Sequence, residues 1–301
     1  MPRRRSALET AAPFCSNRTM NQTQAQTALN KALIRWSLSR ASLIAETPTS
    51  WVYRVEQNGR NPAVLKQLKP DTGDEEQRGS ALLAWYGGEG AATVFDAMGG
   101  VIFMEWLDGP TLGGAARAGR DEEATIALAT VVKALHAARE ADPPPLVPLR
   151  QRYRALLEMP ASRWPTMSKD LLARAVGVAH KLFDKPAASL PLHGDLHHDN
   201  IISTSRGWLA IDPKGLVGDP VYEVANSFLN PMDATRLVTD PRRIVRLADI
   251  YESRLGYSRK RVLGYAATHA ALSACWDIGE GRPVTLQLNM LPLLLAAYGQ
   301  A

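Results

Sequence analysis

Up to about residue 106, the chain mixes short β-rich runs with two stretches whose apolar residues recur at helical spacing. The first helical stretch covers residues 23–39. Two β-rich runs, 51–56 and 63–68, flank the turn signal Asn58-Gly59 and predict an antiparallel hairpin. This part of the chain is therefore expected to contain an antiparallel sheet.

The second helical stretch has the sequence DEEQRGSALLAWYG, and the pair Gly87-Gly88 predicts its end. Two further strands are expected around the turn at Gly99-Gly100. Strands with a helix between them predict a small N-terminal lobe, which we place at residues 23–106.

After LDGPTLGG, a joint rich in Gly and Pro at residues 107–114, apolar residues recur mostly at helical spacing. Helices are expected at about 122–140, 149–158, 168–184, 221–229, 240–255, 260–278 and 284–298. Two apolar runs interrupt this pattern, one beginning at Leu190 and one at 208–211, and are expected to pair as a short hairpin. Residues 107–301 are thus predicted to form a larger, mostly helical lobe, and the fold class is α+β.

The composition is that of an ordinary globular chain, with 46% apolar and 22% charged residues. Its apolar runs are shorter than the roughly 20 residues that span a bilayer, so no transmembrane helix is expected. Cys15 and Cys275 lie far apart, which argues against a disulfide framework and against a zinc site built on thiolates. Such cysteine usage is typical of the reducing cytoplasm.

The net charge of +5 comes from the N-terminal end, because residues 1–40 hold seven basic side chains and a single acid. The rest of the chain is close to neutral. We expect residues 1–22 to be a disordered, solvated tail that contacts neither nucleic acid nor membrane. Glu9 and Thr10 interrupt the apolar core that a secretory signal needs. Whether Met1 or Met20 is the natural start stays open.

The stretch LPLHGDLHHDNIIST, residues 190–204, holds the most concentrated polar chemistry of the chain. Asp195 follows an apolar run in a Gly-Asp turn, Asn200 follows five positions later, and Asp212 ends the second apolar run. If the two runs pair, these three side chains converge. Phosphoryl transfer needs such a set: one carboxylate orients the attacking hydroxyl and accepts its proton, while an amide oxygen and a second carboxylate hold Mg²⁺.

The N-terminal lobe should then supply a cation for the nucleotide phosphates. The run Ala63-Val64-Leu65-Lys66 is a strand that ends in lysine, close to the V-A-I-K pattern. Lys66 is expected to pair with the α- and β-phosphates, and a carboxylate of the following helix should steady it. Glu76 is preferred to Glu75 for that role. Lys69 should face the opposite side of the strand and be solvated.

HGDLHHDN, followed by WLAIDP, resembles the aminoglycoside phosphotransferase family. The segments SRGWLAIDPKGLVGDPVYEVAN, VLKQLKP and LSACW are similar to its streptomycin 6-phosphotransferase branch, also described as aminoglycoside/hydroxyurea resistance kinases. The resemblance runs from about Leu43 to the C-terminus. It implies a two-lobed protein-kinase-like fold, with ATP and Mg²⁺ as cofactors.

The resemblance also implies roles for individual residues. Asp195 matches the catalytic base, and Asn200 and Asp212 match the magnesium ligands. Lys66 and Glu76 match the phosphate-binding lysine and its helix partner. The segment FMEWLDG looks like the strand that leads to the hinge, so adenine is expected to meet the backbone of Glu105 and Leu107, with Met104 behind the base.

The sequence departs from the family pattern at two places. The phosphate-covering position reads ETPTSWVY and has no glycine, so Thr49, Ser50 and backbone N–H groups are expected to cover the phosphates. The family segment G-D-P-x-x-D ends here in Glu223. For a polycationic acceptor, Asp219 and Asp277 are candidate contacts.

These observations predict a cytoplasmic, ATP-dependent O-phosphotransferase whose acceptor is a small hydroxylated molecule, best matched by streptomycin or a related aminoglycoside. A kinase of a cellular amino alcohol or sugar, and a pseudokinase that binds nucleotide without turnover, stay open. So do the hydroxyl phosphorylated, the choice between ATP and GTP, and the oligomeric state, monomer or dimer.

A metallohydrolase built on His193, His197 and His198 is the alternative from another class. It leaves the strand lysine unexplained. In the kinase interpretation His193 and His197 pack the loop and steady Asp195, and His198 lies at the surface. His136 and His180 are expected to be structural.

Overall fold

The computed structural model describes residues 14–58, 61–70, 73–185 and 188–301. The chain divides into two compact units. Unit 1 runs to Thr72 and also includes Asp96–Trp106, and unit 2 comprises Gly73–Phe95 and Leu107–Ala301. Residues 73–95, which the sequence groups with the N-terminal lobe, thus belong to unit 2. No helix among the described residues is long and apolar enough to cross a membrane.

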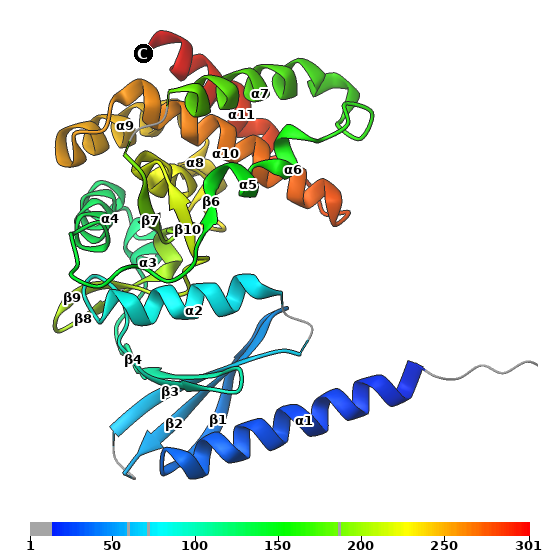
Figure 1. The fold of residues 1–301 in the computed structure, drawn as a ribbon. Coiled ribbons are helices and arrows are strands. Elements are labelled where there is room, and N and C mark those ends of the chain that lie inside the picture. The colour runs from blue at the N-terminus through cyan, green and yellow to red at the C-terminus, as the bar shows by residue number, and fades with distance from the viewer. Residues whose placement is uncertain (1–13, 59–60, 71–72, 186–187) are drawn as a thin grey trace, which may run out of the picture. The chain divides into compact units, whose positions relative to one another are not determined.

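Unit 1 contains a five-stranded sheet in the order β1-β2-β3-β5-β4, covered on one face by helix α1 (Figure 1). The elements are α1 Phe14–Arg35, β1 Leu38–Glu46, β2 Ser50–Gln57, β3 Asn61–Leu68, β4 Val94–Met98 and β5 Val101–Glu105. Strand β2 pairs antiparallel with β1 and β3, and β3 pairs antiparallel with β5. The predicted hairpin is confirmed, although Gly59 of its turn lies outside the described residues.

Alternation along β3 decides which side chains face α1. Ala63, Leu65 and Gln67 are buried, and the first two belong to the apolar core of this unit, together with Leu29 of α1. Gln67 Nε2 donates a 2.6 Å hydrogen bond to the carbonyl of Ala25 in α1. Since neighbouring strand residues face opposite sides, Lys66 lies on the face of the sheet away from α1.

Two details of unit 1 differ from the sequence prediction. Helix α1 begins at Phe14, so residues 14–22 are helical where a disordered tail was expected, and residues 1–13 lie outside the described part. The predicted helix 23–39 ends at Arg35, because Ser37 adopts a left-handed φ of 53° that turns the chain into β1. Strand β1 was not predicted: only Leu38 of its residues is buried, so it shows no alternating pattern.

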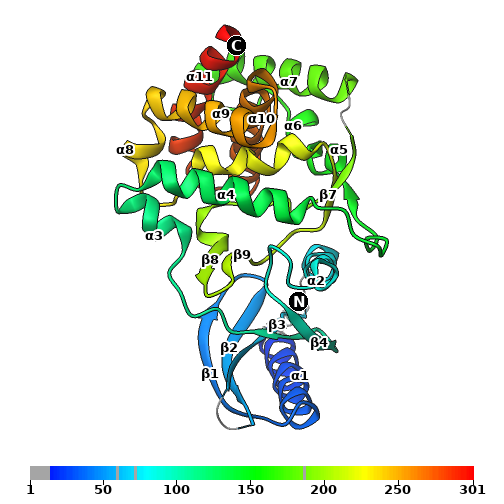
Figure 2. The ribbon, with the colours of Figure 1, turned by 90° about the vertical axis from the view of Figure 1, so that its left-hand side faces the viewer.

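Unit 2 is mostly helical, as predicted. Its α-helices are α2 Asp74–Tyr86, α3 Leu112–Arg117, α4 Asp121–Leu135, α5 Leu149–Arg152, α6 Arg154–Leu157, α7 Lys169–Asp184, α8 Thr235–Val238, α9 Pro241–Leu255, α10 Arg259–Gly279 and α11 Thr285–Gln300. The 3₁₀ segments are η1 Thr166–Ser168, η2 His198–Asn200 and η3 Pro220–Leu229. Helix α10 packs against α7, α9, α11 and η3 (Figure 2).

The predicted hairpin between the stretch 190–204 and the apolar run at 208–211 is formed by the end of that stretch and not by its start at Leu190. Strand β8, Ile201–Thr204, pairs with β9, Gly207–Ala210, because a two-residue turn joins these two segments directly. Strand β7, Leu190–Leu192, pairs with β10, Leu216–Gly218, and β6, Val147–Pro148, lies on the other side of β10. The loop that carries Asp195 therefore lies between a strand of one sheet and a strand of another.

Candidate active site

His193 begins the loop 193–200 and bonds three backbone groups around it. Its buried ring donates from Nε2 to the carbonyl of Ile211 at 2.8 Å, and its Nδ1 accepts a hydrogen bond from the N–H of Asp195 at 3.3 Å. The carbonyl of His193 accepts a 2.7 Å bond from the N–H of Lys214. Burial lowers the pKa of His193, so the ring is neutral. His193 bonds backbone groups and steadies Asp195, as predicted.

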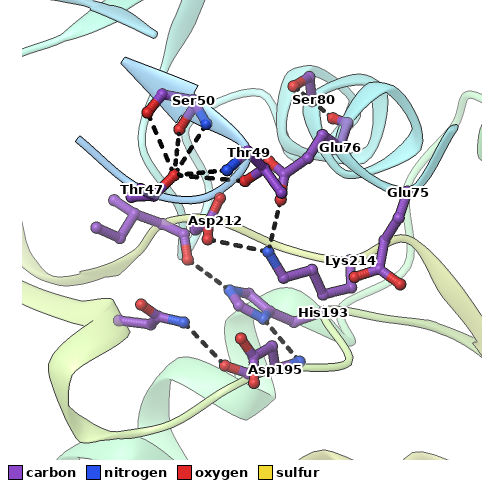
Figure 3. Close-up of polar contacts among 12 residues, drawn as sticks. Thr47, Thr49, Ser50, Glu75, Glu76, Ser80, His193, Asp195, Asp212 and Lys214 are labelled. Atoms are coloured by element: carbon purple, nitrogen blue, oxygen red, sulfur yellow. Dashed lines mark hydrogen bonds and ion pairs between the residues drawn. The ribbon is translucent and has the colours of Figure 1, made fainter. Parts of the chain in front are cut away.

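The carboxylate of Asp195 is oriented by an amide that the sequence did not point to. Asn226 Nδ2 donates to Asp195 Oδ1 at 2.9 Å (Figure 3 shows the bonds around Asp195). Asn230 Nδ2 in turn donates to Asn226 Oδ1 at 3.0 Å, which fixes the rotamer of that amide. Asp195 is thus held in one orientation by a side chain of η3.

Backbone and amide contacts bring the loop close to the segment that contains Asp212. Asn200 Nδ2 donates to the carbonyl of Asp195 at 3.0 Å, and the N–H of Ile211 donates to the carbonyl of Asn200 at 2.9 Å. Asp212 follows with a left-handed φ of 62°, a conformation that Asp tolerates better than most residues. The geometry therefore groups the residues predicted to act as base and metal ligands.

The donor set at this point fits Mg²⁺. Because Asn200 uses Nδ2 toward Asp195, its Oδ1 is the atom left to accept or to ligate. Together with the carboxylate of Asp212, it provides oxygen ligands, which this hard cation prefers. Asn200 and Asp212 are the residues that would hold the ion.

Lys214, which the sequence did not point to, joins two carboxylates of unit 2. Its Nζ lies 2.9 Å from Glu76 Oε1 of α2 and 3.1 Å from Asp212 Oδ2 (Figure 3). Burial alone would lower the pKa of Lys214, but the charges of Asp212 and Glu76 outweigh it and raise the pKa, so the amine stays protonated. The sequence assigned Glu76 to Lys66 of unit 1, and that pairing stays a prediction.

Glu223, where the family pattern has aspartate, anchors the beginning of the loop 193–200. Its carboxylate accepts the N–H of His193 at 2.8 Å and the N–H of Gly194 at 3.0 Å. His136 Nε2 lies 3.1 Å from the same carboxylate. Burial acts to raise the pKa of Glu223, but the hydrogen bond and charge of His136 outweigh burial. The net effect is a lowered pKa, so Glu223 is ionised. The longer side chain thus makes loop contacts directly, and His136 is structural as predicted.

The prediction that His198 lies at the surface is wrong. The tight turn of η2 directs its neighbour Asp199 to Arg117 and Thr111, at 2.8 and 3.1 Å, and encloses the ring of His198. Burial lowers the pKa of His198 to about 3, so it is neutral. His197 accepts the N–H of Asp199 at 3.2 Å, as a loop-packing residue would.

The histidines do not form a metal centre. Within residues 14–58, 61–70, 73–185 and 188–301, no three His, Cys, Asp or Glu side chains are arranged to hold a metal ion. His193 and His197 instead use ring nitrogens for backbone bonds of the loop. The metallohydrolase alternative therefore has no support from the described part of the chain.

The two carboxylates suggested as acceptor contacts are engaged within the protein. Asp219 is buried, caps η3 through a 3.0 Å bond from the N–H of Val221, and lies 2.5 Å from Arg261 Nε. Asp277 accepts from Gln287 Nε2 at 2.5 Å and from an Arg282 nitrogen at 2.7 Å. These contacts give both carboxylates a structural role, and a contact of either one with an acceptor stays a prediction.

The remaining predicted nucleotide contacts lie mostly in unit 1. Lys66 is on β3, Met104 and Glu105 end β5, and Ser50 begins β2; Leu107 opens the second segment of unit 2. The turn between β1 and β2 is ordered without glycine, because Thr47 Oγ1 accepts the N–H groups of Ser50 and Thr49 at 2.9 and 3.3 Å. Contacts of these residues with a nucleotide stay predictions.

An N-terminal antiparallel sheet followed by a mostly helical remainder is the architecture of the protein-kinase-like fold. The same fold occurs in a thermostable mutant of aminoglycoside phosphotransferase APH(4)-Ia, solved with ADP and hygromycin B, at a TM-score of 0.65 and 13% identity over 89% of this chain and 97% of that one. A choline/ethanolamine kinase family protein from Mesorhizobium loti matches at a TM-score of 0.64 and 16% identity, over 94% of this chain and 99% of that one.

The family model described as aminoglycoside/hydroxyurea antibiotic resistance kinase matches residues 35–281, and the chain belongs to this family. A streptomycin 3''-kinase from Klebsiella pneumoniae is 38% identical over 82% of this chain and 91% of its own length. A streptomycin 6-kinase from Streptomyces griseus is 29% identical over 82% and 81%. The protein is thus an enzyme that transfers a phosphoryl group to an alcohol acceptor, as the sequence predicted.

Proposed function

We propose that the protein transfers the γ-phosphoryl group of ATP to a hydroxyl of an aminoglycoside, and that streptomycin is its acceptor. The observation that carries the proposal is the carboxylate of Asp195, which Asn226 orients at 2.9 Å and whose loop Glu223 anchors. Relatives named as streptomycin kinases support the acceptor. They are named for two different positions, 3'' and 6, so the proposal leaves the hydroxyl open.

Asp195 acts on the acceptor. It accepts a hydrogen bond from the hydroxyl, which points the hydroxyl oxygen at the γ-phosphorus. A bond forms between that oxygen and phosphorus while the bond from phosphorus to the β,γ-bridging oxygen breaks, so ADP leaves with the electron pair. The hydroxyl proton passes to Asp195 and from there to water. Because Asn226 and His193 hold the loop in place, the carboxylate needs little reorganisation.

We propose that Lys66 pairs with the α- and β-phosphates with Glu76 as its partner, that Thr49 and Ser50 cover the phosphates, and that the Glu105 and Leu107 backbone meets adenine beside Met104. When bound, Mg²⁺ on Asn200 and Asp212 supplies positive charge that offsets the charge on the phosphates.

An acceptor screen by mass spectrometry tests the function. The protein is incubated with ATP and Mg²⁺ and, in separate reactions, with streptomycin, hygromycin B, hydroxyurea, an amino alcohol or a sugar. Streptomycin should gain one phosphoryl group in step with ADP formation. Phosphorylation of the amino alcohol or sugar alone would establish a metabolic kinase instead, and nucleotide binding with no product from any acceptor would establish a pseudokinase.

A further inference from the structure

Lys214 places a buried positive charge between a residue of α2 and the predicted metal ligand Asp212. Its side chain is only 13% exposed, and Glu76 is less exposed still, at 6%. A protonated amine at 2.9 and 3.1 Å from two carboxylates is bonded to both at once. The position is two residues after Asp212, within the segment Asp212-Pro213-Lys214-Gly215.

The backbone around Lys214 is built for this contact. Helix α2 approaches so closely that a Cβ on Gly79 would lie 1.9 Å from the carbonyl oxygen of Pro213. Gly215 has a φ of 69°, and a Cβ there would lie 3.0 Å from the backbone of Arg78. Because Glu76 and Gly79 are three residues apart, they share one face of α2, and the close approach at Gly79 brings Glu76 to the amine.

The N–H of Lys214 also fixes the residue against the catalytic loop. It donates to the carbonyl of His193 at 2.7 Å, while the ring of His193 binds the carbonyl of Ile211 just before Asp212. Lys214 is therefore held at both ends, by its backbone to the loop and by its amine to two carboxylates. A buried ion pair adds little net stability, because desolvation of the two charges offsets their attraction. Here one partner of the pair belongs to the proposed metal site, which gives the contact a second role.

We infer that Lys214 is a positioning residue of the phosphate site: its amine orients Asp212 and offsets carboxylate charge that would otherwise repel the nucleotide phosphates. The inference rests on the proposed function. Without Mg²⁺, the negative charges of Asp212 and Glu76 would repel the phosphates of ADP, and this amine would offset that repulsion. When Mg²⁺ is present, the metal supplies charge of the same sign, so the amine should matter less.

The test is the ratio of ADP affinities measured with Mg²⁺ and with EDTA, by calorimetry, in wild type and in Lys214→Met. The variant should bind metal-free ADP on the order of tenfold more weakly, because the carboxylates of Asp212 and Glu76 then repel the phosphates without compensation. Its affinity for ADP with Mg²⁺ should fall less, so the ratio of the affinity with Mg²⁺ to the affinity with EDTA rises. Lys214→Arg should restore the wild-type ratio, since it keeps the charge.

Arg243→Met is the matched control. Arg243 is another buried cation of unit 2, paired with Asp121 at 2.8 Å and donating to the carbonyl of Asn230 at 2.8 Å. Its loss should lower Tm while leaving the ADP ratio unchanged, because neither partner belongs to the proposed phosphate site. If wild type phosphorylates streptomycin but Lys214→Met keeps the wild-type ratio of ADP affinities, this inference is overturned and the proposed function stands. Wild type that does not bind ADP at all would overturn the inference together with the proposed function.

Discussion

The orientation of the Asp195 carboxylate depends on a chain of amides. Asn230 fixes Asn226, and Asn226 donates to Asp195. Sequence alone identified Asp195 because the motif HGDLHHDN surrounds it. Asn226 and Lys214 carry no such motif: Asn226 is 31 residues from Asp195 in sequence, and Lys214 is 138 residues from Glu76.

Replacing Asn226 by Leu should lower kcat without a comparable change in the KM for ATP. The leucine keeps the approximate volume but removes the N–H group that orients Asp195, and misorientation of a catalytic group costs about tenfold to a hundredfold in rate. Steady-state kinetics with ATP and streptomycin provide the measurement. Equal kcat in wild type and variant would show that Asn226 does not position the base.

Glu223→Gln tests the anchor of the loop through pH. The pKa of Glu223 is lowered from its usual 4.5, so its contribution to the free energy of unfolding is fully present above that value and is lost as pH falls through the folded-state pKa. The variant should be less stable than wild type by about 2 kcal/mol near neutral pH, the usual cost of losing hydrogen bonds to a charged group.

The difference between Glu223→Gln and wild type should then shrink below pH 4.5. Chemical denaturation at a series of pH values measures it. A gap that is constant down to the acid transition would mean that the charge of Glu223 contributes nothing, and that the substitution acts through packing alone.

At the scale of elements, the apolar pattern predicted most helices of unit 2, because their buried faces repeat at helical spacing. Pairing of strands was harder to predict. The sequence paired the stretch 190–204 with the run at 208–211. The end of that stretch does so, as β8 with β9, whereas its start, β7, pairs with β10. The two-residue turn after Thr204 is the sequence signal that favours pairing of β8 with β9.

The contact between α2 and Pro213 should not tolerate a side chain at Gly79. Gly79→Ala would place Cβ 1.9 Å from the Pro213 carbonyl oxygen, and the forced shift of α2 should cost about 1–3 kcal/mol. Gly177→Ala on α7 is the matched control, because its Cβ would meet nothing within 4 Å and the change should stabilise by about 0.4–1 kcal/mol. Thermal denaturation should show opposite shifts in Tm; the same shift in both would refute this packing.

At the scale of the whole molecule, the sequence predicted a kinase-like fold from the resemblance of its motifs, and the two units carry those motifs as expected. Unit 1 presents Lys66 on the face of its sheet away from α1. Unit 2 holds Asp195, Asn200, Asp212 and Lys214 in one bonded group. The acceptor site is the part on which the sequence is least informative: Asp219 and Asp277, the carboxylates suggested for it, are bonded within unit 2, and their contact with an acceptor stays a prediction.

The most direct test of the account compares wild type and Asp195→Asn with ATP, Mg²⁺ and streptomycin, following phosphorylated streptomycin by mass spectrometry and ADP binding by calorimetry. Asparagine keeps the shape and can still accept from Asn226, but it cannot take the hydroxyl proton. We predict product from wild type only, a loss of at least about a hundredfold in the variant, and nearly equal ADP affinity in both. Equal turnover by the two proteins would contradict the central claim that Asp195 is the base of this kinase.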